Sequence, residues 1–387
     1  MLMQRELHTG NEPLLECHYY DARLCRSCTF ISTPQNIQLA NKQVRAEGLI
    51  SAEQWLEPYA SGRAVFRNKV KLAVTGTMDA PNLGIIRNDG EGQDLRECPL
   101  PTPGIQEATP RLAQFVAECG FAPYDPRTNH GALKFVMITE SPDGELMVRF
   151  VAKRRGVQGM LFKKIDRLRE LVPAARVVSL NVQPERKAIL EGDEEILIFD
   201  ADSLPMNLEV AGRDLTLSLR PQSFFQTNTE AAQVLYTRAV EWLDGIESAW
   251  DLYCGIGGFG LALASRGTRV VGVESDEQAV FAAGESAAAM GVPAEFVAAD
   301  ANEWVRGQSE VPEAIVVNPP RRGIGPELAE WIEASGVRTV LYSSCHVHTL
   351  AKDLAVMSSY RVTRAQVVDM FPHTKHFEVV ALLELSS

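Results

Sequence analysis

Residues 248–274 read SAWDLYCGIGGFGLALASRGTRVVGVE, and this stretch decides the fold. It predicts an apolar strand at 248–253, a glycine-rich turn that opens a helix, and a second apolar strand at 269–274 that ends in Glu274. Glycines let the backbone turn tightly and approach a ligand. This order is typical of a nucleotide-binding α/β unit, although a glycine-rich turn alone is weak evidence.

The same alternation of helices and strands extends over residues 216–387. Helices are predicted at 229–244, 276–290, 301–308, 326–334 and 347–357. Further strands are predicted at 294–299, 314–318 and 338–343, with two closing strands near 360–368 and 376–384. The pattern predicts a Rossmann-like, doubly wound and mostly parallel α/β sheet. Ligands of such sheets bind beyond the carboxyl ends of the strands.

The first 215 residues follow a different pattern. Residues 1–50 carry three cysteines and a predicted helix at 34–49, and they are too few to form a core of their own. Residues 51–215 are rich in predicted strands (70–78, 133–140 and 145–152) and contain helical patterns at 110–119 and 159–170. We therefore expect an N-terminal segment (1–50), an α+β middle domain (51–215) and an α/β domain (216–387).

Composition indicates an ordinary globular protein. The 387 residues include 45% hydrophobic and 23% charged residues, which argues against collagen-like, disulfide-scaffold and disordered chains. Neither a signal peptide nor a membrane span is predicted, so a cytoplasmic protein with reduced thiols and no membrane partner is expected. The net charge is -12, yet residues 153–187 hold ten bases and three acids. Together with basic residues at 63–71, this segment is either a solvated surface or a site that holds RNA phosphates.

Acidic and polar residues at the predicted strand ends suggest the ligand. Asp251 lies four residues before Gly255, and Glu274 closes the next strand. An acid at that strand end accepts hydrogen bonds from the hydroxyls of an unphosphorylated ribose, as in NAD or S-adenosylmethionine. Asn318 follows a third strand and begins the stiff turn Asn318-Pro319-Pro320-Arg321, for which a dehydrogenase has no requirement. The combination favours S-adenosylmethionine over NAD.

A thiol and a carboxylate follow in the same domain. Cys345 lies at the end of a predicted strand, and Glu378 interrupts an apolar one, so that it must be paired, solvated or functional. Methylation of carbon 5 of uracil needs such a pair. Addition of a thiolate to carbon 6 makes carbon 5 nucleophilic, and a base then removes the proton from carbon 5. An inert thiol and a surface acid are the alternative interpretations.

Four other cysteines suggest a metal centre. Cys17, Cys25 and Cys28 have C-x7-C-x2-C spacing, and Cys98 lies far downstream. Four thiolates suit zinc or an iron-sulfur cluster, and the ligand types do not separate the two.

Taken together, these motifs resemble the RNA uracil-5 methyltransferases that use S-adenosylmethionine and carry an iron-sulfur cluster. The resemblance covers nearly the whole chain and is closest to a branch that acts on 23S rRNA. It rests on YDARLCRSC (20–28), FRNKVKL (66–72), LRECPL (95–100), PQSFFQTN (221–228), DLYCGIGGFG (251–260), VNPPRRGIG (317–325), YSSCHVHT (342–349) and DMFPHTKHFEV (369–379).

The resemblance implies a class I methyltransferase domain and a role for each motif residue. It implies a [4Fe-4S] cluster on Cys17, Cys25, Cys28 and Cys98, and contacts to S-adenosylmethionine from Gln226, Tyr253, Glu274 and Asn318. Cys345 would be the nucleophile and Glu378 the base. The implied partner is 23S rRNA, with a flipped-out uridine as the reacting group, and no obligate protein partner is implied.

Three features differ among relatives. Many relatives have Asp at the position of Asn318 and Asn at that of His346, and one sibling carries an extra N-terminal RNA-binding barrel that is not expected here. A tRNA uracil-5 methyltransferase and a non-catalytic iron-sulfur RNA-binding module are the competing hypotheses. An amino-group methyltransferase is disfavoured, because Arg321 stands where such enzymes have an aromatic residue after Asn-Pro-Pro.

Overall fold

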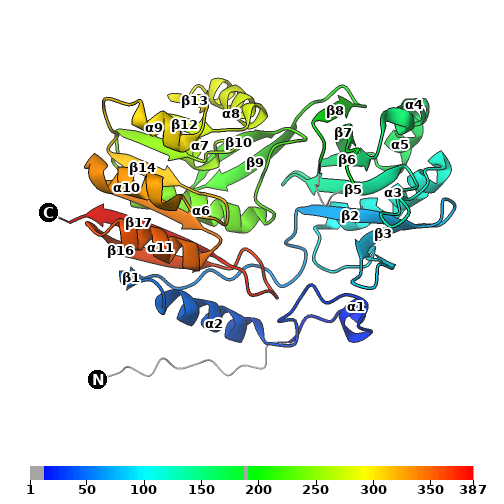
Figure 1. Cartoon of the computed structure of the whole chain (residues 1–387), viewed down its shortest axis with the longest axis horizontal. Coiled ribbons are helices and arrows are strands. Elements are labelled where there is room, and N and C mark those ends of the chain that lie inside the picture. The colour runs from blue at the N-terminus through cyan, green and yellow to red at the C-terminus, as the bar shows by residue number, and fades with distance from the viewer. Residues whose placement is uncertain (1–12, 187–190, 387) are drawn as a thin grey trace.

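The computed structural model describes residues 13–186 and 191–386. Two halves, each built on a β-sheet, lie side by side, and the N-terminal segment runs along both of them (Figure 1).

The α/β half contains an eight-stranded sheet in the order β1-β16-β17-β15-β14-β11-β12-β13. All neighbouring strands are parallel except β17, which is antiparallel to both β15 and β16. The strands are β1 (Ala52–Trp55), β11 (Ser248–Leu252), β12 (Arg269–Glu274), β13 (Ala294–Ala298), β14 (Ala314–Val317), β15 (Thr339–Ser344), β16 (Tyr360–Val368) and β17 (Glu378–Leu385). The predicted doubly wound sheet is confirmed.

Helices cover both faces of this sheet (Figure 1). One buried cluster includes residues of α6 (Thr229–Trp242), α7 (Gly258–Ala264) and α8 (Glu277–Met290). The opposite cluster includes residues of α2 (Gln35–Glu47), α9 (Ala301–Arg306), α10 (Gly325–Ser335) and α11 (Val347–Val356). Side-chain caps explain three helix starts, because Asn228, Asp276 and Asp300 each accept hydrogen bonds from free backbone N–H groups of the first turn.

The other half contains a seven-stranded sheet with helices on one face, which confirms the α+β expectation. The strand order is β4-β3-β2-β5-β6-β7-β8. The strands are β2 (Lys69–Gly76), β3 (Pro81–Ile86), β4 (Gly92–Asp94), β5 (Leu133–Glu140), β6 (Leu146–Ala152), β7 (Ala175–Val182) and β8 (Glu194–Leu197). The helices are α3 (Pro103–Cys119), η1 (Arg155–Val157), α4 (Gln158–Lys163) and α5 (Ile165–Leu171).

Two helix predictions in this half need correction. The helix predicted at 110–119 begins earlier because Pro103 occupies its first turn, where a missing N–H costs nothing. The helix predicted at 159–170 is two helices, because the backbone of Lys164 leaves the helical region at φ -110° and ψ 20°.

Several elements of residues 13–219 pack against the α/β half. Strand β1 pairs with β16, and the hairpin of β9 (Leu204–Val210) and β10 (Arg213–Leu219) contributes to the same buried cluster as α6 to α8. The short α1 (His18–Asp21) lies below β3 in Figure 1. The division at residues 50 and 215 therefore stays a prediction. Within the described ranges, no helix combines the length and the apolar character of a membrane span.

Candidate active site

The strand order brings five of the predicted site residues to one edge of the eight-stranded sheet. Tyr253, Asn318 and Cys345 each come directly after a parallel strand, β11, β14 and β15, and Glu274 is the last residue of β12. Glu378 is the first residue of β17, and since β17 is antiparallel to β15, its start lies at that same edge. From β12 to β17 the order along the edge is Glu274, Tyr253, Asn318, Cys345, Glu378.

Glu378 is a buried carboxyl group with one hydrogen-bond partner. Its side chain is 2% exposed, and Oε1 accepts a hydrogen bond from the Ser343 hydroxyl at 3.0 Å. Burial raises the pKa of Glu378 to about 8, and the hydrogen bond from Ser343 opposes that rise. A carboxyl group with a pKa near the working pH is suited to accept and release protons.

The Cys345 thiol lies close enough to Glu378 to be affected by its charge. The thiol is half-buried, and burial raises its pKa, with a further rise from the negative charge of Glu378. The guanidinium of Arg321 acts against both and lowers the pKa of the thiol through its positive charge. The thiolate therefore forms most easily when Glu378 is protonated and Arg321 is in place.

The glycine-rich turn has the backbone geometry that its sequence predicts. Tyr253 has φ +62°, and Gly255 and Gly257 have φ +54° and +83°. A Cβ atom on Gly258 would lie 2.4 Å from the ring of Tyr236, so this position has no room for a side chain. The turn thus depends on glycine for both backbone conformation and packing.

Two acids hold the turn in place. Asp251 Oδ2 accepts a hydrogen bond from the Gly260 N–H at 2.7 Å, and burial raises the pKa of Asp251 to about 7. Its buried Oδ1 has no partner among the described residues. Glu274 accepts hydrogen bonds from the N–H groups of Gly255 (3.2 Å), Ser275 (2.7 Å) and Asp276 (3.1 Å), which orient its carboxylate beside the turn.

Gln226 lies outside the strand edge, in the segment between β10 and α6. Asn68, from the other half, donates to the Gln226 carbonyl at 3.0 Å, and its own N–H donates to the Thr227 carbonyl at 3.0 Å. These bonds tie the PQSFFQTN segment to the residue that precedes β2. Whether the Gln226 side chain contacts the same ligand as Tyr253 stays a prediction.

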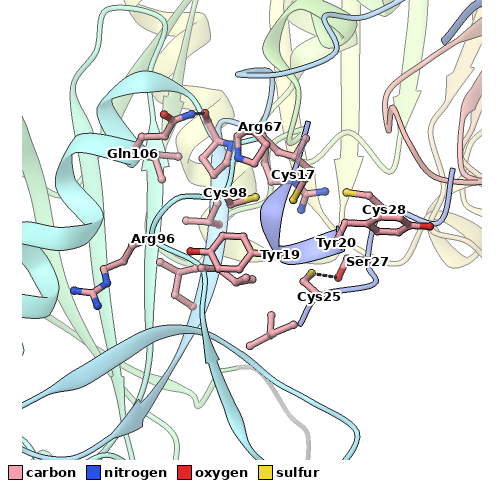
Figure 2. A pocket seen from close by; sticks show the side chains of 18 of the residues that line it. Cys17, Tyr19, Tyr20, Cys25, Ser27, Cys28, Arg67, Arg96, Cys98 and Gln106 are labelled. Carbon is pink, nitrogen blue, oxygen red and sulfur yellow. Dashed lines mark hydrogen bonds between the residues drawn. The ribbon is translucent and has the colours of Figure 1, made fainter. Parts of the chain in front are cut away.

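The four predicted metal-ligand cysteines line one cavity of about 180 Å³. Cys17, Cys25 and Cys28 come from the N-terminal segment and Cys98 from the loop before α3, and Figure 2 shows their sulfur atoms around a common space. Burial raises the pKa of Cys28 to about 12, and the nearby charges of Cys98, Cys25 and Cys17 add to the rise. No three His, Cys, Asp or Glu side chains of the described chain converge on the position of a single metal ion.

Sequence reasoning missed a buried network that holds the segment before Glu378. Lys42 Nζ lies 2.6 Å from Asp369 Oδ1, and His373, at φ +63°, donates its N–H to Gln38 Oε1 at 2.9 Å. Lys42 and Gln38 lie on α2, more than 300 positions away in sequence. An Asp at the end of an apolar strand was the only local signal, and it does not identify the partner.

Comparison with known proteins places these features in one family. A family profile described as tRNA (Uracil-5-)-methyltransferase matches residues 176–311 and 303–386. The 23S rRNA (uracil(747)-C(5))-methyltransferase RlmC of Yersinia enterocolitica is 40% identical over 95% of this chain and 99% of its own length. The protein of that name from Yersinia pestis is 39% identical over 96% and 100%.

A solved structure agrees with these matches. The crystal structure of Pyrococcus abyssi tRNA (uracil-54, C5)-methyltransferase in complex with S-adenosyl-L-homocysteine has a TM-score of 0.79 and 27% identity. The similarity covers 92% of this chain and 85% of that one, so both halves of the molecule are included.

Proposed function

The chain belongs to the RNA uracil-5 methyltransferase family, and from this premise we propose that it methylates carbon 5 of one uridine in 23S rRNA. The relatives with the highest identity given above carry the name of a 23S rRNA enzyme that acts on uracil 747. The tRNA enzyme of known structure is more distant, at 27% identity. The 23S rRNA assignment is therefore favoured over tRNA. A cytoplasmic location, where rRNA is modified, is part of the proposal.

One observation carries the chemical proposal: the Cys345 thiol and the Glu378 carboxyl group lie at the ends of adjacent strands, close enough that the charge of Glu378 raises the pKa of the thiol. A thiol beside a buried carboxyl group supplies the nucleophile and the base that methylation of uracil carbon 5 requires. A non-catalytic RNA-binding module has no use for this pair, which counts against that alternative.

The residues at the strand edge suit S-adenosylmethionine. Glu274 presents an oriented carboxylate that can accept hydrogen bonds from ribose hydroxyls. Tyr253, Gln226 and Asn318 complete the proposed set of contacts, and the orphaned Oδ1 of Asp251 leaves one buried acceptor available to a ligand or water. When bound, S-adenosylmethionine supplies an electrophilic methyl group.

The protein groups act in sequence on the uracil. The Cys345 sulfur forms a bond to carbon 6, and the ring electrons shift toward the carbonyl oxygen, which makes carbon 5 nucleophilic. After carbon 5 carries the methyl group, the Glu378 carboxylate takes the proton from carbon 5. The bond between sulfur and carbon 6 then breaks, and the double bond between carbons 5 and 6 is restored. Arg321 stabilises the thiolate at the start and at the end.

The shared cavity of the four cysteines supports a metal centre, since four thiolates suit either zinc or an iron-sulfur cluster. The family resemblance favours the cluster. We propose that Cys17, Cys25, Cys28 and Cys98 hold a [4Fe-4S] cluster, which links the N-terminal segment to the loop before α3.

The test of the function is transfer of radiolabelled methyl groups from S-adenosylmethionine to protein-free 23S rRNA, followed by nucleoside analysis. We expect 5-methyluridine in 23S rRNA, none in tRNA, and none with Cys345→Ala. Label in tRNA would support the competing tRNA enzyme. Absence of label in both RNAs, from protein that binds the methyl donor, would contradict the proposed function.

The test of the cluster is iron, sulfide and zinc content of anaerobically purified protein. We expect one sulfide per iron atom in the wild-type protein, and the same content in Cys119→Ala, because Cys119 is a buried cysteine outside the cavity. We expect both iron and sulfide to be lost in Cys98→Ala. Zinc in place of iron would overturn the cluster. An unchanged melting temperature and RNA affinity in Cys98→Ala would overturn its structural role.

A further inference from the structure

Four exposed cations from four separate elements surround the proposed nucleophile. They are Arg45 on α2, Arg321 in the turn after β14, Lys352 on α11 and Lys375 in the loop before β17. We call them the cationic rim. Resting on the proposed function, we propose that the cationic rim binds the RNA phosphates on both sides of the target uridine and so positions the base over Cys345.

Direct contacts and electrostatic couplings place the rim around the active site. The Arg45 guanidinium lies over the ring of Phe377, 6.0 Å from its centre, and Phe377 precedes Glu378 in the chain. The Arg321 guanidinium is close enough to lower the pKa of the Cys345 thiol, and the Thr349 hydroxyl, from α11, donates to the Arg321 carbonyl at 3.2 Å. The rim therefore borders both residues of the proposed chemistry.

The histidines between the rim residues report the same positive field. Burial lowers the pKa of His346, and the charges of His348, Arg45, Arg321 and Lys352 lower it further. Burial also lowers the pKa of His376, with further lowering by the charges of Arg321, Lys375, Lys42 and Arg45. Arg45 and Arg321 thus act on both histidines, which places these two rim cations close to both loops.

No acid neutralises the rim. None of the four rim cations forms an ion pair with another described residue, and the acids of the same segments have other partners: the exposed Glu47 accepts from Gln43 at 2.7 Å, and the remaining three acids are buried. Asp353 accepts from the Tyr342 hydroxyl at 2.6 Å, Asp369 is paired with Lys42, and Glu378 accepts from Ser343. In a chain of net charge -12, an uncompensated cluster of cations indicates an anionic partner.

The basic segment at 153–187 offers a contrast. In the sequence this segment has the higher density of bases and is the stronger candidate for phosphate binding. In the structure, however, four of its arginines are each paired with a carboxylate: Arg155, Arg167, Arg169 and Arg176. Paired arginines gain less from a phosphate, because the existing ion pair must be broken first. The four rim cations, by contrast, form no ion pair and lie at the nucleophile, where an RNA strand with a flipped-out base has to pass.

The salt dependence of RNA binding tests the rim. Each phosphate contact contributes about 0.7 to the slope of log affinity against log salt for single-stranded RNA. Arg45→Gln/Lys375→Gln removes two rim charges that do not touch the reacting atoms. We expect the slope to fall by about 1.4 and the affinity for a 23S rRNA fragment to fall by about 10- to 25-fold at 0.1 M salt. We also expect a larger change in KM for RNA than in kcat.

The matched control is Arg361→Gln. Arg361 is exposed, is paired with Glu53, and lies near the start of β16, which places it at the opposite edge of the sheet. We expect wild-type affinity and slope from this variant. If the double variant keeps the wild-type slope and affinity, the proposed role of the cationic rim is wrong. If the wild-type protein itself does not bind the 23S rRNA fragment, the proposed function is wrong, and the role of the rim with it.

Discussion

The buried ion pair between α2 and the segment that precedes Glu378 leads to a quantitative prediction. The side chains of Lys42 and Asp369 are 2% and 0% exposed, and the Lys42 ammonium also donates to the Phe371 carbonyl at 3.2 Å. Asp369 Oδ2 is buried without a hydrogen-bond partner, and within the described ranges Lys42 is the cation that forms an ion pair with this carboxylate. Lys42→Met leaves the carboxylate buried and unpaired.

Loss of one member of such a pair costs about 3–5 kcal/mol. This corresponds to a change of about two to almost four orders of magnitude in the folding equilibrium. Lys42→Met/Asp369→Asn removes the charge that remains, and we expect it to recover most of the loss. The network also holds the main chain here, since Ser61 donates to the Asp369 carbonyl at 2.6 Å, so the single variant should reduce kcat as well.

Urea unfolding followed by tryptophan fluorescence measures the effect in the α/β half, which contains the ion pair. All five tryptophans, at positions 55, 242, 250, 304 and 331, lie in elements of the eight-stranded sheet or the helices that cover it. A loss below about 1 kcal/mol in Lys42→Met, or a double variant as unstable as the single one, would refute the reasoning.

Three further predictions concern the active site. Glu378→Gln should lower turnover by about two to four orders of magnitude and accumulate a covalent complex with RNA on a denaturing gel; normal turnover without a complex would exclude Glu378 as the base. Since burial raises the pKa of Glu378 to about 8, its carboxylate form, and with it kcat, should increase from pH 6 to pH 8.5. Between about pH 4.5 and 8 the Glu378 carboxyl group is protonated in the folded protein and ionised in the unfolded chain. The free energy of unfolding should therefore decrease as the pH rises through this range. Urea midpoints should fall less over that range in Glu378→Gln, and parallel curves would contradict the assignment. Gly258→Ala places a methyl group 2.4 Å from Tyr236 and should cost about 1–3 kcal/mol with loss of donor binding. Gly284→Ala, in the middle of α8 with nothing within 4 Å of the added atom, should instead stabilise by about 0.5–1 kcal/mol. Equal effects of the two glycine substitutions would contradict the packing argument.

The α/β half could be predicted from the sequence because its elements are regular. Strands such as β12 are short apolar runs, and helices such as α8 begin at an acidic cap and end at a left-handed glycine. Once their order is known, the placement of Glu274, Asn318 and Cys345 at one edge follows from the parallel topology alone.

Contacts that join distant segments could not be predicted. Neither Lys42 nor Asp369 shows its partner in the sequence, and β1 pairs with a strand about 300 residues away. The count of bases at 153–187 does not show their pairing for a related reason: Arg155, Arg167 and Arg176 meet acids that the linear sequence does not place beside them. Binding of phosphates by this segment stays a prediction. Net charge along a segment does not show which charges the fold leaves unpaired.

The most direct test of the central claim is to trap the covalent intermediate on Cys345. In a 23S rRNA fragment that carries 5-fluorouridine at the target, fluorine replaces the hydrogen that Glu378 would remove as a proton, so the sulfur cannot leave. We predict a complex that survives denaturation, requires S-adenosylmethionine, and yields an RNA adduct on the peptide containing Cys345 by mass spectrometry. Absence of an adduct from active protein, or an adduct on another cysteine, would contradict the account.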